Sequence, residues 1–341
     1  MRAMILAAGL GTRLRPLTRL EPKPMLPMLG RPMLMHHLTV LEAIGVREVI
    51  VNLHYLPHRV REGLARAYAG PIRLHFHEEP TLLGTGGGIK AVADFLREPG
   101  EPFLVLNGDA LMALDCDRLL RHHRRGGCLA TMVLRADARA ARFGRIGVDR
   151  GHRITRFLDL ARGPGPVDAY GLFTGVHVFE PDVLDMIPEG PCCINRSVYP
   201  RLVARGMAGA YFQEGYWSDV GTPSRYLEAN LALLNGTFSS DAFPHDVLES
   251  PPFGDGSVDG GNVERLISPV VIDSGVKLDR GIVLGPSVWI GAGACLGAGV
   301  RLADALVWPG TNVPPGFSAR RAVLWQEGER FRVLDALPED G

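Results

Sequence analysis

Residues 6–27 read LAAGLGTRLRPLTRLEPKPMLP, and this stretch decides how the rest of the chain is interpreted. It overlaps the end of a short apolar run, residues 3–8, which we predict to be a buried strand. Its glycines therefore fall where a strand ends and the chain turns. Gly9 and Gly11 carry no Cβ, so the backbone can come close to a ligand at both positions. The stretch predicts a ligand-binding loop at the end of a strand.

Three cations follow the glycines within the same loop, namely Arg13, Arg15 and Lys23. A loop that combines cations with exposed backbone N–H groups meets the requirements of a triphosphate. The alternative is an ordinary strand-to-helix turn with solvated arginines. The glycine spacing does not separate the two interpretations, because both the full GxGxxG pattern and the Walker pattern GxxxxGK[ST] are absent.

The whole stretch, LAAGLGTRLRPLT followed by PKPMLP, resembles the signature of the sugar-1-phosphate nucleotidyltransferases, also called NDP-sugar pyrophosphorylases. The resemblance implies that Arg13 and Lys23 contact the nucleotide phosphates and the departing pyrophosphate, with Arg15 as a further candidate. It also implies nucleotide contacts from the strand end and the loop, at Leu6, Ala8, Gly9, Gly11 and Thr12.

The composition limits the partners and the location that we expect. With 341 residues the chain is long enough for two domains, and its 37 Lys and Arg residues balance 37 Asp and Glu residues. No overall positive field is available to hold nucleic acid or an anionic membrane, so we expect neither as a partner. Five cysteines without CxxC spacing, no secretion signal and no long apolar stretch favour a cytoplasmic protein.

Strands and helices alternate along the first part of the chain. We predict strands at residues 48–53 and 72–76 and helices at residues 33–44 and 57–68. This alternation predicts a Rossmann-like α/β fold with a mixed, mostly parallel sheet between helices. Ligands of such sheets bind beyond the carboxyl ends of the strands. Later predicted strands are 103–106, 128–135, a turn-linked pair within 144–157, 172–179 and 209–213, and later predicted helices are 181–186, 197–204 and 223–235.

A second glycine-bearing segment, residues 78–88 (EEPTLLGTGGG), lies between a predicted strand and a predicted helix at residues 89–96. Glycines before a helix N-terminus suit the close approach of a ligand, whereas the alternative is a flexible linker. In the resembled family a segment of the LGTGG type lies against the nucleotide base. The resemblance therefore implies nucleotide contacts from Glu79, Gly84, Thr85 and Gly86.

The glutamates of this segment favour guanine. Guanine offers two donors on its Watson–Crick edge, N1–H and the exocyclic amine, and a carboxylate can accept both. The order EEP…LGTGG resembles that of mannose-1-phosphate guanylyltransferases, which favours GTP contacted by Glu78 or Glu79. The run GTGGGI and a missing EKP motif also resemble a uridylyltransferase of cell-wall sugar recycling, so UTP is the alternative.

Two carboxylates are candidates for metal binding. Asp109 closes the turn Asn107-Gly108-Asp109 at the end of a predicted strand, where a side chain projects into the ligand crevice. Magnesium needs one or two such carboxylates together with phosphate oxygens, although Asn-Gly-Asp is also a common turn. The turn resembles the metal-binding NGD of the family, and Asp219 in YWSDVGTP resembles its second metal ligand. The resemblance implies nucleotide contacts from Asn107 and Gly108, and Mg²⁺ bound by Asp109 and Asp219. Thr222 is a good N-cap for the helix that follows.

The sugar-contacting part departs from the family. Many relatives carry FxEKP, whose Glu and Lys contact the sugar and its phosphate, where this chain has FLDL at residues 157–160. Asp159 can replace the Glu, but Leu160 cannot replace the Lys, and Arg145 or Arg162 could supply the missing cation. The resemblance also implies sugar contacts from Gly144, Thr174 and Gly175. Without the family context, a strand bulge explains the last of these glycines equally well.

The sequence changes character after residue 236. Residues 237–266 are rich in Gly, Pro, Ser and Asp, so we predict a linker after a catalytic domain at residues 1–236. From residue 267 to 325, aliphatic residues recur every six positions, a period that neither a helix nor a single strand explains. One register holds Ile272, Leu278, Leu284, Ile290, Leu296, Leu302 and Trp308, and the other holds Val276, Ile282, Val288, Ala294, Val300 and Leu306.

Hexapeptide repeats of this kind predict a parallel β-helix. They resemble the left-handed β-helix appended to many nucleotidyltransferases. We expect this domain to be structural or to form a homo-oligomer, with residues 326–341 as a C-terminal tail.

Together the motifs imply an enzyme that transfers a nucleotidyl group from a nucleoside triphosphate to a sugar 1-phosphate. The sugar-phosphate oxygen is itself the nucleophile, so catalysis requires alignment and charge neutralisation. The residues implied for this task are Arg13, Lys23, Asp109 and Asp219, with Mg²⁺ as cofactor. We expect GTP with mannose 1-phosphate or a manno-heptose 1-phosphate. The alternatives are a uridylyltransferase that makes a UDP-sugar such as UDP-N-acetylmuramate, and a non-catalytic regulatory homologue.

Overall fold

The computed structural model describes residues 1–137, 145–237 and 263–336. The contacts within the chain divide it into two compact units. The first comprises Met1–Leu10 and Leu34–Trp217, and the second comprises Gly11–Met33 and Ser218–Gly341. The strand before the glycine-rich loop therefore belongs to the first unit, whereas most of the loop belongs to the second.

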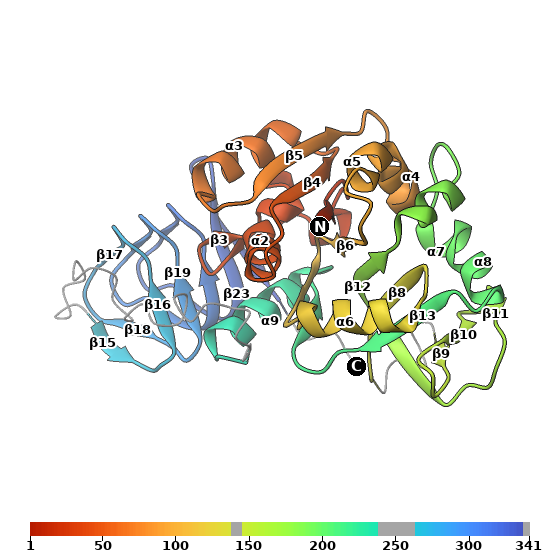
Figure 1. Ribbon diagram of the computed structural model, residues 1–341. Coiled ribbons are helices and arrows are strands. Elements are labelled where there is room, and N and C mark those ends of the chain that lie inside the picture. Colours follow the sequence, from red (N-terminus) through yellow and green to blue (C-terminus); the bar gives the residue numbers. More distant parts are fainter. Residues whose placement is uncertain (138–144, 238–262, 337–341) are drawn as a thin grey trace. The chain divides into compact units, whose positions relative to one another are not determined.

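A mixed ten-stranded sheet forms the centre of the first unit (Figure 1). Its strands are β1 (Arg2–Leu6), β4 (Glu48–Leu53), β5 (Arg73–Glu78), β6 (Phe103–Asn107), β8 (Ala130–Arg135), β9 (Ile146–Val148), β10 (Ile154–Phe157), β11 (Ala161–Arg162), β12 (Ala169–Phe179) and β13 (Ala208–Phe212). The main path runs β11-β10-β9-β12-β6-β1-β4-β5, and β8 joins β12 to β13. The predicted Rossmann-like α/β fold with a mixed sheet is confirmed.

Four of these strands, β5, β4, β1 and β6, run parallel. Most residues of β1, β4 and β6 are buried, as expected of apolar strands covered on both faces. The chain passes outward from β1 to β4 and β5 and then returns to β6, on the other side of β1. In such sheets a ligand binds at this reversal, beyond the carboxyl ends of β1 and β6.

The other half of the sheet is largely antiparallel, which the prediction of a mostly parallel sheet did not include. Strand β12 pairs antiparallel with β6, β8 and β9, and β10 and β11 continue in the same way. A register shift between Phe173 and His177 marks a bulge in β12, and Gly175 within it has a φ of 97°. A bulge that needs a positive φ accounts for this glycine in structural terms.

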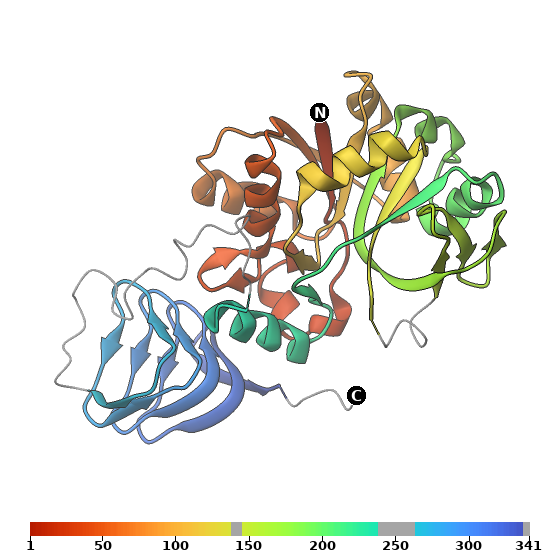
Figure 2. The same ribbon diagram turned by 60° about the horizontal axis from the view of Figure 1, so that its bottom comes forward.

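Seven α-helices occur among the described residues of the first unit. They are α2 (Met33–Ala43), α3 (Pro57–Ala67), α4 (Gly84–Ala91), α5 (Ala93–Arg97), α6 (Cys116–Gly126), α7 (Ile194–Ser197) and α8 (Tyr199–Ala204). The first residue of α2, Met33, is assigned to the second unit. A hydrophobic core packs α4, α5, α7 and α8 against the sheet. Helix α6 lies along β8 and β13 (Figure 2). Within the described ranges, no helix combines the length and the apolar character needed to cross a membrane.

Two helix predictions need correction. The sequence predicts a helix at residues 89–96 after a glycine loop, but α4 begins at Gly84 and α5 follows after Val92. Glycine is a poor helix former, so propensity conceals this first helical turn. The predicted helix at residues 181–186 is a 3-10 helix, η4 (Pro181–Met186).

The glycine-rich loop in the second unit is made of short turns. It contains the 3-10 helices η1 (Thr12–Leu14) and η2 (Lys23–Met25), the single-turn helix α1 (Leu17–Leu20), and a hairpin of β2 (Pro27–Met28) and β3 (Arg31–Pro32). Helix α9 (Pro223–Leu234) also belongs to this unit. Thr222 caps α9 as predicted, because its side chain accepts a hydrogen bond from the Arg225 backbone N–H.

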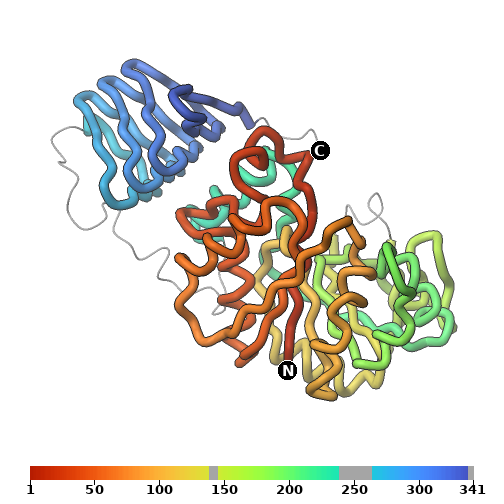
Figure 3. The backbone as a smooth tube through the Cα atoms, turned by 90° about the horizontal axis from the view of Figure 1, so that it is seen from above, coloured from red at the N-terminus to blue at the C-terminus, as the bar shows by residue number. Residues whose placement is uncertain are grey.

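The C-terminal strands of the second unit stack as parallel coils (Figure 3). They are β15 (Val263–Leu266), β16 (Val270–Ile272), β17 (Lys277–Leu278), β18 (Ile282–Leu284), β19 (Val288–Ile290), β20 (Cys295–Leu296), β21 (Arg301–Val307), β22 (Asn312–Val313) and β23 (Ser318–Glu327). Val270 pairs with Val288 and Lys277 with Cys295, so a coil takes about 18 residues. The apolar residues inside the coils, such as Ile272, Ile290 and Leu302, form a separate core.

The first and last strands of this stack lie outside residues 267–325, the bounds predicted for the β-helix. Strand β15 uses the last four residues of the predicted linker, most of which lies outside the described residues. A final strand, β24 (Arg330–Asp335), pairs antiparallel with β23 and lies within the residues predicted to be a tail.

Candidate active site

The carboxyl ends of β1 and β6 are joined directly. Gly108 donates its backbone N–H to the Leu6 carbonyl oxygen at 2.9 Å, and a Cβ added at Gly108 would lie 2.8 Å from the same oxygen. A residue without a Cβ therefore lets the Asn107-Gly108-Asp109 turn pass this close to Leu6. Asp109 is half-buried and precedes β7 (Ala110–Met112). The first unit thus brings Leu6, Asn107, Gly108 and Asp109 together, as the fold-based prediction requires.

A buried pair of polar side chains connects this end of the sheet to the second glycine segment. Asn52, at the end of β4, accepts a hydrogen bond from the Ala7 backbone N–H at 2.7 Å. Its amide nitrogen donates to Glu79 Oε1 at 2.7 Å, and Glu79 Oε2 accepts from the Leu83 backbone N–H at 3.0 Å. Asn52 and Glu79 are each only 3% exposed. Asn52 was not among the predicted site residues, although a polar residue near the end of the apolar strand EVIVNL was a usable signal.

The geometry gives the two adjacent glutamates different roles. Glu79 already accepts two hydrogen bonds from the protein, so its carboxylate holds the start of α4 in place. A Cβ at Gly88 would lie 2.8 Å from Glu79 Oε1, which explains the glycine there. Glu78 is exposed and forms an ion pair with Arg61 at 2.7 Å.

The other glycines of α4 also face protein atoms. A Cβ at Gly84 or Gly86 would lie 2.6 Å from the carbonyl oxygen or the Sγ of Cys192, and one at Gly87 would lie 2.6 Å from the Gly190 carbonyl oxygen. The backbone N–H groups of Gly86 and Gly87 donate to the Cys192 carbonyl oxygen. The segment before α7 therefore satisfies donors that are otherwise left unpaired at a helix N-terminus.

Thr85 takes part in the same packing, because its hydroxyl accepts a hydrogen bond from the Ile194 backbone N–H at 3.0 Å. The predicted nucleotide-binding residues Gly84, Thr85 and Gly86 thus form the interface between α4 and the residue 190–194 segment. Their glycines are explained by packing before any ligand is considered.

The predicted sugar-binding residues of β12 lie next to the Asn107 turn. A Cβ at Gly175 would lie 3.1 Å from Cβ of Asn107. The Thr174 hydroxyl donates to the Val133 carbonyl oxygen at 2.8 Å, and the Thr174 carbonyl oxygen accepts from Trp217 Nε1 at 2.7 Å. Thr174 therefore orders the backbone beside the turn.

The other residues predicted to contact the sugar do not cluster beside this turn. The side chain of Asp159 is 97% exposed and lies 3.4 Å from Arg156. Arg145 lies over the ring of Tyr170 at 5.7 Å, and Arg162 is exposed on β11. Gly144 lies outside the described residues.

In the second unit, Gly11 shapes the cationic loop. It adopts the left-handed conformation with a φ of 60°, and its carbonyl oxygen accepts from the Thr18 hydroxyl at 2.8 Å. A Cβ at Gly11 would lie 3.3 Å from Cβ of Lys23, so the backbone of η1 passes close to the start of η2. Thr12 and Arg13 are exposed on η1, and Lys23 is half-buried at the start of η2.

Asp219 also lies beside this loop within the second unit. It ends β14 (Trp217–Asp219), and its Oδ2 accepts from Arg225 Nη1 at 2.9 Å. A Cβ at Gly221 would lie 2.8 Å from Asp219 Oδ1 and 3.1 Å from Arg13 Nη2, so the guanidinium of Arg13 is close to the Asp219 carboxylate. The sequence analysis missed Arg225, which lies on the first turns of α9.

The surroundings of the Asp219 carboxylate are suited to binding a metal ion. Its Oδ1 is buried and has no hydrogen-bond partner among the described residues. A buried carboxylate oxygen without a donor is costly unless a cation satisfies it. The described residues contain no group of three or more His, Cys, Asp or Glu side chains that could hold a metal ion without other ligands. A metal at Asp219 would therefore depend on substrate phosphate oxygens, which is the usual arrangement for Mg²⁺.

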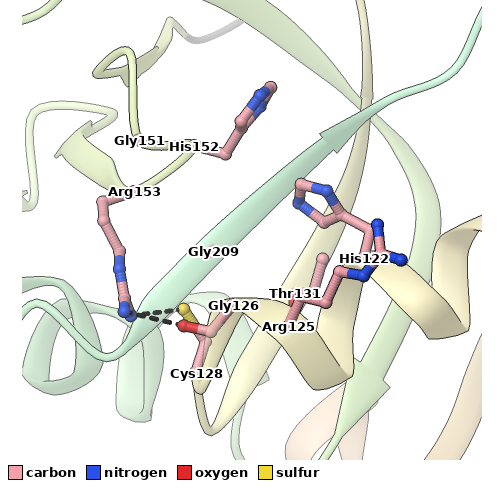
Figure 4. Close-up of a pocket in the computed structure, with 9 residues that line it drawn as sticks. All are labelled: His122, Arg125, Gly126, Cys128, Thr131, Gly151, His152, Arg153 and Gly209. Atoms are coloured by element: carbon pink, nitrogen blue, oxygen red, sulfur yellow. Dashed lines mark hydrogen bonds between the residues drawn. The ribbon is translucent and has the colours of Figure 1, made fainter.

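A separate cavity of about 200 Å³ lies between α6, the β9–β10 turn and β13 in the first unit (Figure 4). Arg153 at its edge donates to Cys128 Sγ and to the carbonyl oxygens of Gly126 and Gly206, and so ties the end of α6 to β10. Burial lowers the pKa of His122 on its other side. None of the predicted site residues lines this cavity, and we assign it no part in the candidate site.

Comparison with known proteins identifies the family. The model of a family described as "Nucleotidyl transferase" matches residues 2–236. The chain is 37% identical over 245 residues to a mannose-1-phosphate guanylyltransferase of Mycobacterium tuberculosis, a match that covers 70% of this chain and 66% of the relative. It is 31% identical over 275 residues to a mannose-1-phosphate guanyltransferase of Yarrowia lipolytica, covering 79% of this chain and 72% of that protein.

A solved structure agrees at the level of the fold. The crystal structure of HddC from Yersinia pseudotuberculosis superposes with a TM-score of 0.58 at 24% sequence identity, covering 68% of this chain and 99% of that one. The match of the family model to residues 2–236 confirms the family implied by residues 6–27. The family model covers more than half of the chain, and the chain belongs to the nucleotidyl transferase family.

Proposed function

We propose that this protein transfers a guanylyl group from GTP to mannose 1-phosphate and releases pyrophosphate. The observation that carries the proposal is the identity of 37% and 31% with two proteins named as mannose-1-phosphate guanylyltransferases. The chain also carries the glycine-rich signature, the Asn-Gly-Asp turn and the YWSDVGTP segment. A manno-heptose 1-phosphate is the second acceptor to test.

The chemistry needs no nucleophile from the protein. An oxygen of the sugar 1-phosphate attacks the α-phosphorus of GTP, the bond to the oxygen bridging to the β-phosphate breaks, and its electron pair leaves with pyrophosphate. The attacking oxygen is already an oxyanion, so no base is required. Arg13 and Lys23 stabilise the charge of the departing pyrophosphate, and the backbone from Leu6 to Thr12 approaches the nucleotide.

We assign Asp109 and Asp219 as protein ligands of Mg²⁺. When bound, the ion offsets negative charge on the triphosphate and fixes it for in-line attack. The buried Asp219 Oδ1 without a donor among the described residues supports this assignment. We expect Asp109→Asn and Asp219→Asn each to lower kcat on the order of 10²- to 10³-fold, with an unchanged Tm.

The double variant distinguishes one ion from two. If both carboxylates hold the same Mg²⁺, the double variant is little worse than either single variant, because residues that act as a unit are not additive. Losses that multiply would argue against a shared ion. Asp117→Asn, an exposed carboxylate on α6, serves as the control and should keep normal activity.

Binding of the nucleotide base is assigned to the segment that follows Glu78 and Glu79. Because Glu79 is buried and accepts hydrogen bonds from Asn52 and Leu83, it would act by holding α4 and the preceding loop in the shape that accepts the base. A uridylyltransferase is the alternative that shares the GTGGGI run.

A substrate matrix tests the proposal. The full chain is incubated with Mg²⁺ and each common NTP against mannose 1-phosphate, a manno-heptose 1-phosphate, glucose 1-phosphate and N-acetylmuramate 1-phosphate, and pyrophosphate release is measured. The highest kcat/KM is expected for GTP with mannose 1-phosphate. A preference for UTP with N-acetylmuramate 1-phosphate would replace the guanylyl assignment, and no release with any pair would favour a regulatory homologue. The Arg13→Ala variant controls for contaminating activity.

Three further assignments accompany this function. We propose that the C-terminal coils are hexapeptide repeats of a left-handed β-helix, which coils of about 18 residues, three sides of six, support. We also propose a cytoplasmic homo-oligomer. Light scattering of the purified full chain would test the oligomer, and a single-chain mass would contradict it.

A further inference from the structure

The loop that carries Lys23 ends in a hairpin with an unfavourable backbone. Pro27 pairs with Pro32 and Met28 with Arg31, which leaves Leu29 and Gly30 as the two turn residues. Their φ angles are 45° and 81°, so both are in the left-handed region. Turns with two positive φ angles usually carry Asn or Gly at the first position, because a branched or bulky side chain crowds the backbone there. Something outside the hairpin must hold Leu29 in this conformation.

Helix α9 supplies the first support. Asn230 is fully buried, and its Oδ1 accepts a hydrogen bond from the Leu29 backbone N–H at 3.0 Å. Its amide nitrogen donates to the Tyr226 carbonyl oxygen at 2.9 Å and contacts Met28 Sδ at 3.3 Å. These contacts fix the orientation of the amide, so that its oxygen faces the strained turn.

The stacked coils supply the second support. Trp308 Nε1 donates to the Tyr226 hydroxyl at 3.1 Å, and that hydroxyl donates to the Pro27 carbonyl oxygen at 2.5 Å. Tyr226 is fully buried and Trp308 is 6% exposed, so this relay is shielded from water. At the tip of the hairpin, a Cβ on Gly30 would lie 3.0 Å from Asp273 Oδ2, which accepts from Trp289 Nε1.

The hairpin is joined to Lys23 by consecutive backbone hydrogen bonds. Leu26 donates to the Lys23 carbonyl oxygen at 3.2 Å, and the Met33 N–H, after the hairpin, donates to the Leu26 carbonyl oxygen at 3.0 Å. With only Pro24 and Met25 between the two bonded residues, a shift of the hairpin is passed on to the lysine.

We propose that Tyr226 and Asn230, backed by Trp308, are positioning residues that hold the turn at residues 27–30 and thereby place Lys23 for pyrophosphate. The C-terminal coils then contribute to turnover, in addition to the structural or oligomer-forming role that the sequence analysis expects. This inference rests on the role of Lys23 in the proposed function.

The test removes one hydroxyl. Tyr226→Phe keeps the ring but loses both hydrogen bonds of the relay, and Trp308→Phe loses the donor behind it. In the reverse reaction, from GDP-sugar and pyrophosphate, we expect Tyr226→Phe to raise the KM for pyrophosphate about five- to tenfold, the effect of losing the one relay hydrogen bond that reaches the loop, from the Tyr226 hydroxyl to the Pro27 carbonyl oxygen. The KM for GDP-sugar should stay unchanged. The Tyr226→Phe, Trp308→Phe double variant should be little worse than Tyr226→Phe alone.

A matched control lies in the same coils. Trp325 is 4% exposed, and its Nε1 is buried without a partner among the described residues. The Trp325 ring packs against that of Trp308, with the ring centroids 6.5 Å apart, so Trp325→Phe makes the same change beside the relay as Trp308→Phe but breaks no hydrogen bond seen in the described chain. It should leave the KM for pyrophosphate at the wild-type value.

A second readout does not depend on the reaction. Hydrogen exchange of peptides covering residues 23–33 should be faster in Tyr226→Phe and Asn230→Leu than in the wild type and in Trp325→Phe. Wild-type exchange and a wild-type KM for pyrophosphate in Tyr226→Phe would overturn the proposal. If the wild-type enzyme transfers no nucleotide at all, the proposed function fails, and the exchange data still decide whether these residues hold the turn.

Discussion

The two glycine-bearing segments of this protein look alike in sequence but differ in what occupies the space beside their glycines. Around Gly9, which is exposed, no described heavy atom lies within 4 Å of an added Cβ. At Gly84, Gly86, Gly87 and Gly88, an added Cβ would lie 2.6–2.8 Å from atoms of Cys192, Gly190 or Glu79. Gly9 therefore leaves room that a ligand can take, whereas Gly11 of the same segment packs against Thr18 and Lys23, and the four glycines of the second segment all face protein atoms.

The difference shows what a glycine in a motif means. A glycine records that something comes close to the backbone, but it does not say whether that neighbour is a substrate or another part of the chain. Substitutions in the two segments should therefore affect different quantities. The signature loop should govern turnover, and the α4 segment should govern folding stability.

The largest effect is expected at Arg13. Arg13→Ala should lower kcat on the order of 10²-fold or more, the scale of removing one preorganised charge from a transition state. The Tm should not change, because Arg13 is exposed. Arg19→Ala is the matched control, since Arg19 is an exposed cation of the same loop. Steady-state kinetics and a thermal melt decide the outcome, and a normal kcat in Arg13→Ala would make it an ordinary surface residue.

Gly87→Ala should act on stability. Its Cβ would lie 2.6 Å from the Gly190 carbonyl oxygen, a backbone atom that cannot rotate away. We expect a loss of about 1–3 kcal/mol in the free energy of unfolding, as for other overpacked sites. Gly126→Ala is the control, because no described atom lies within 4 Å of its Cβ and it ends α6. Denaturant titration should show Gly126→Ala to be neutral or stabilised, and equal effects of the two substitutions would remove the distinction drawn here.

Glu79→Gln separates positioning from direct contact with the base. Asn52 and Leu83 donate to different oxygens of the Glu79 carboxylate, and in glutamine one of these oxygens is replaced by an NH2 group, which leaves one of the two donors facing another donor. We expect a cost of about 1–2 kcal/mol in stability and equal losses of kcat/KM for GTP and UTP. If the carboxylate contacts guanine directly, as predicted from the sequence, the substitution should instead lower kcat/KM for GTP and leave that for UTP nearly unchanged. A loss confined to GTP would restore that role.

The smallest effect on stability is expected at Gly9. Gly9→Ala should change the free energy of unfolding by less than about 0.5 kcal/mol, as usual for an exposed site. Because the new methyl group enters the open space beside the loop, the KM for the NTP should rise. An unchanged KM would show that no ligand uses this space.

Much of the fold followed from local patterns. The apolar run EVIVNL gave β4 with its bounds, and Thr222 was placed correctly as the N-cap of α9. The first turn of α4 could not be predicted, because its first five residues are four glycines and one threonine, and its stability comes from the Cys192 carbonyl oxygen. That partner lies more than a hundred positions away and follows no period.

The residues of the candidate site also separate into those that local sequence patterns predict and those that depend on distant partners. The turn at residues 107–109 could be predicted because it follows an apolar strand, and the sheet topology explains why it meets Leu6. Asn52, Arg225 and Asn230 were missed, since their roles depend on hydrogen bonds to residues 45, 6 and 201 positions away. Side chains of this kind become visible only when the backbone brings their partners together.

The antiparallel strand β24 also determines whether the stack of coils can grow. A parallel stack presents unpaired backbone groups at its last strand, onto which another chain could add and continue the ladder. In the described chain, β24 pairs with residues 322–327 of β23 and runs antiparallel to it. A further parallel rung has no matching edge to extend at that position. The reversal therefore removes this part of β23 as a template for end-to-end growth of the solenoid.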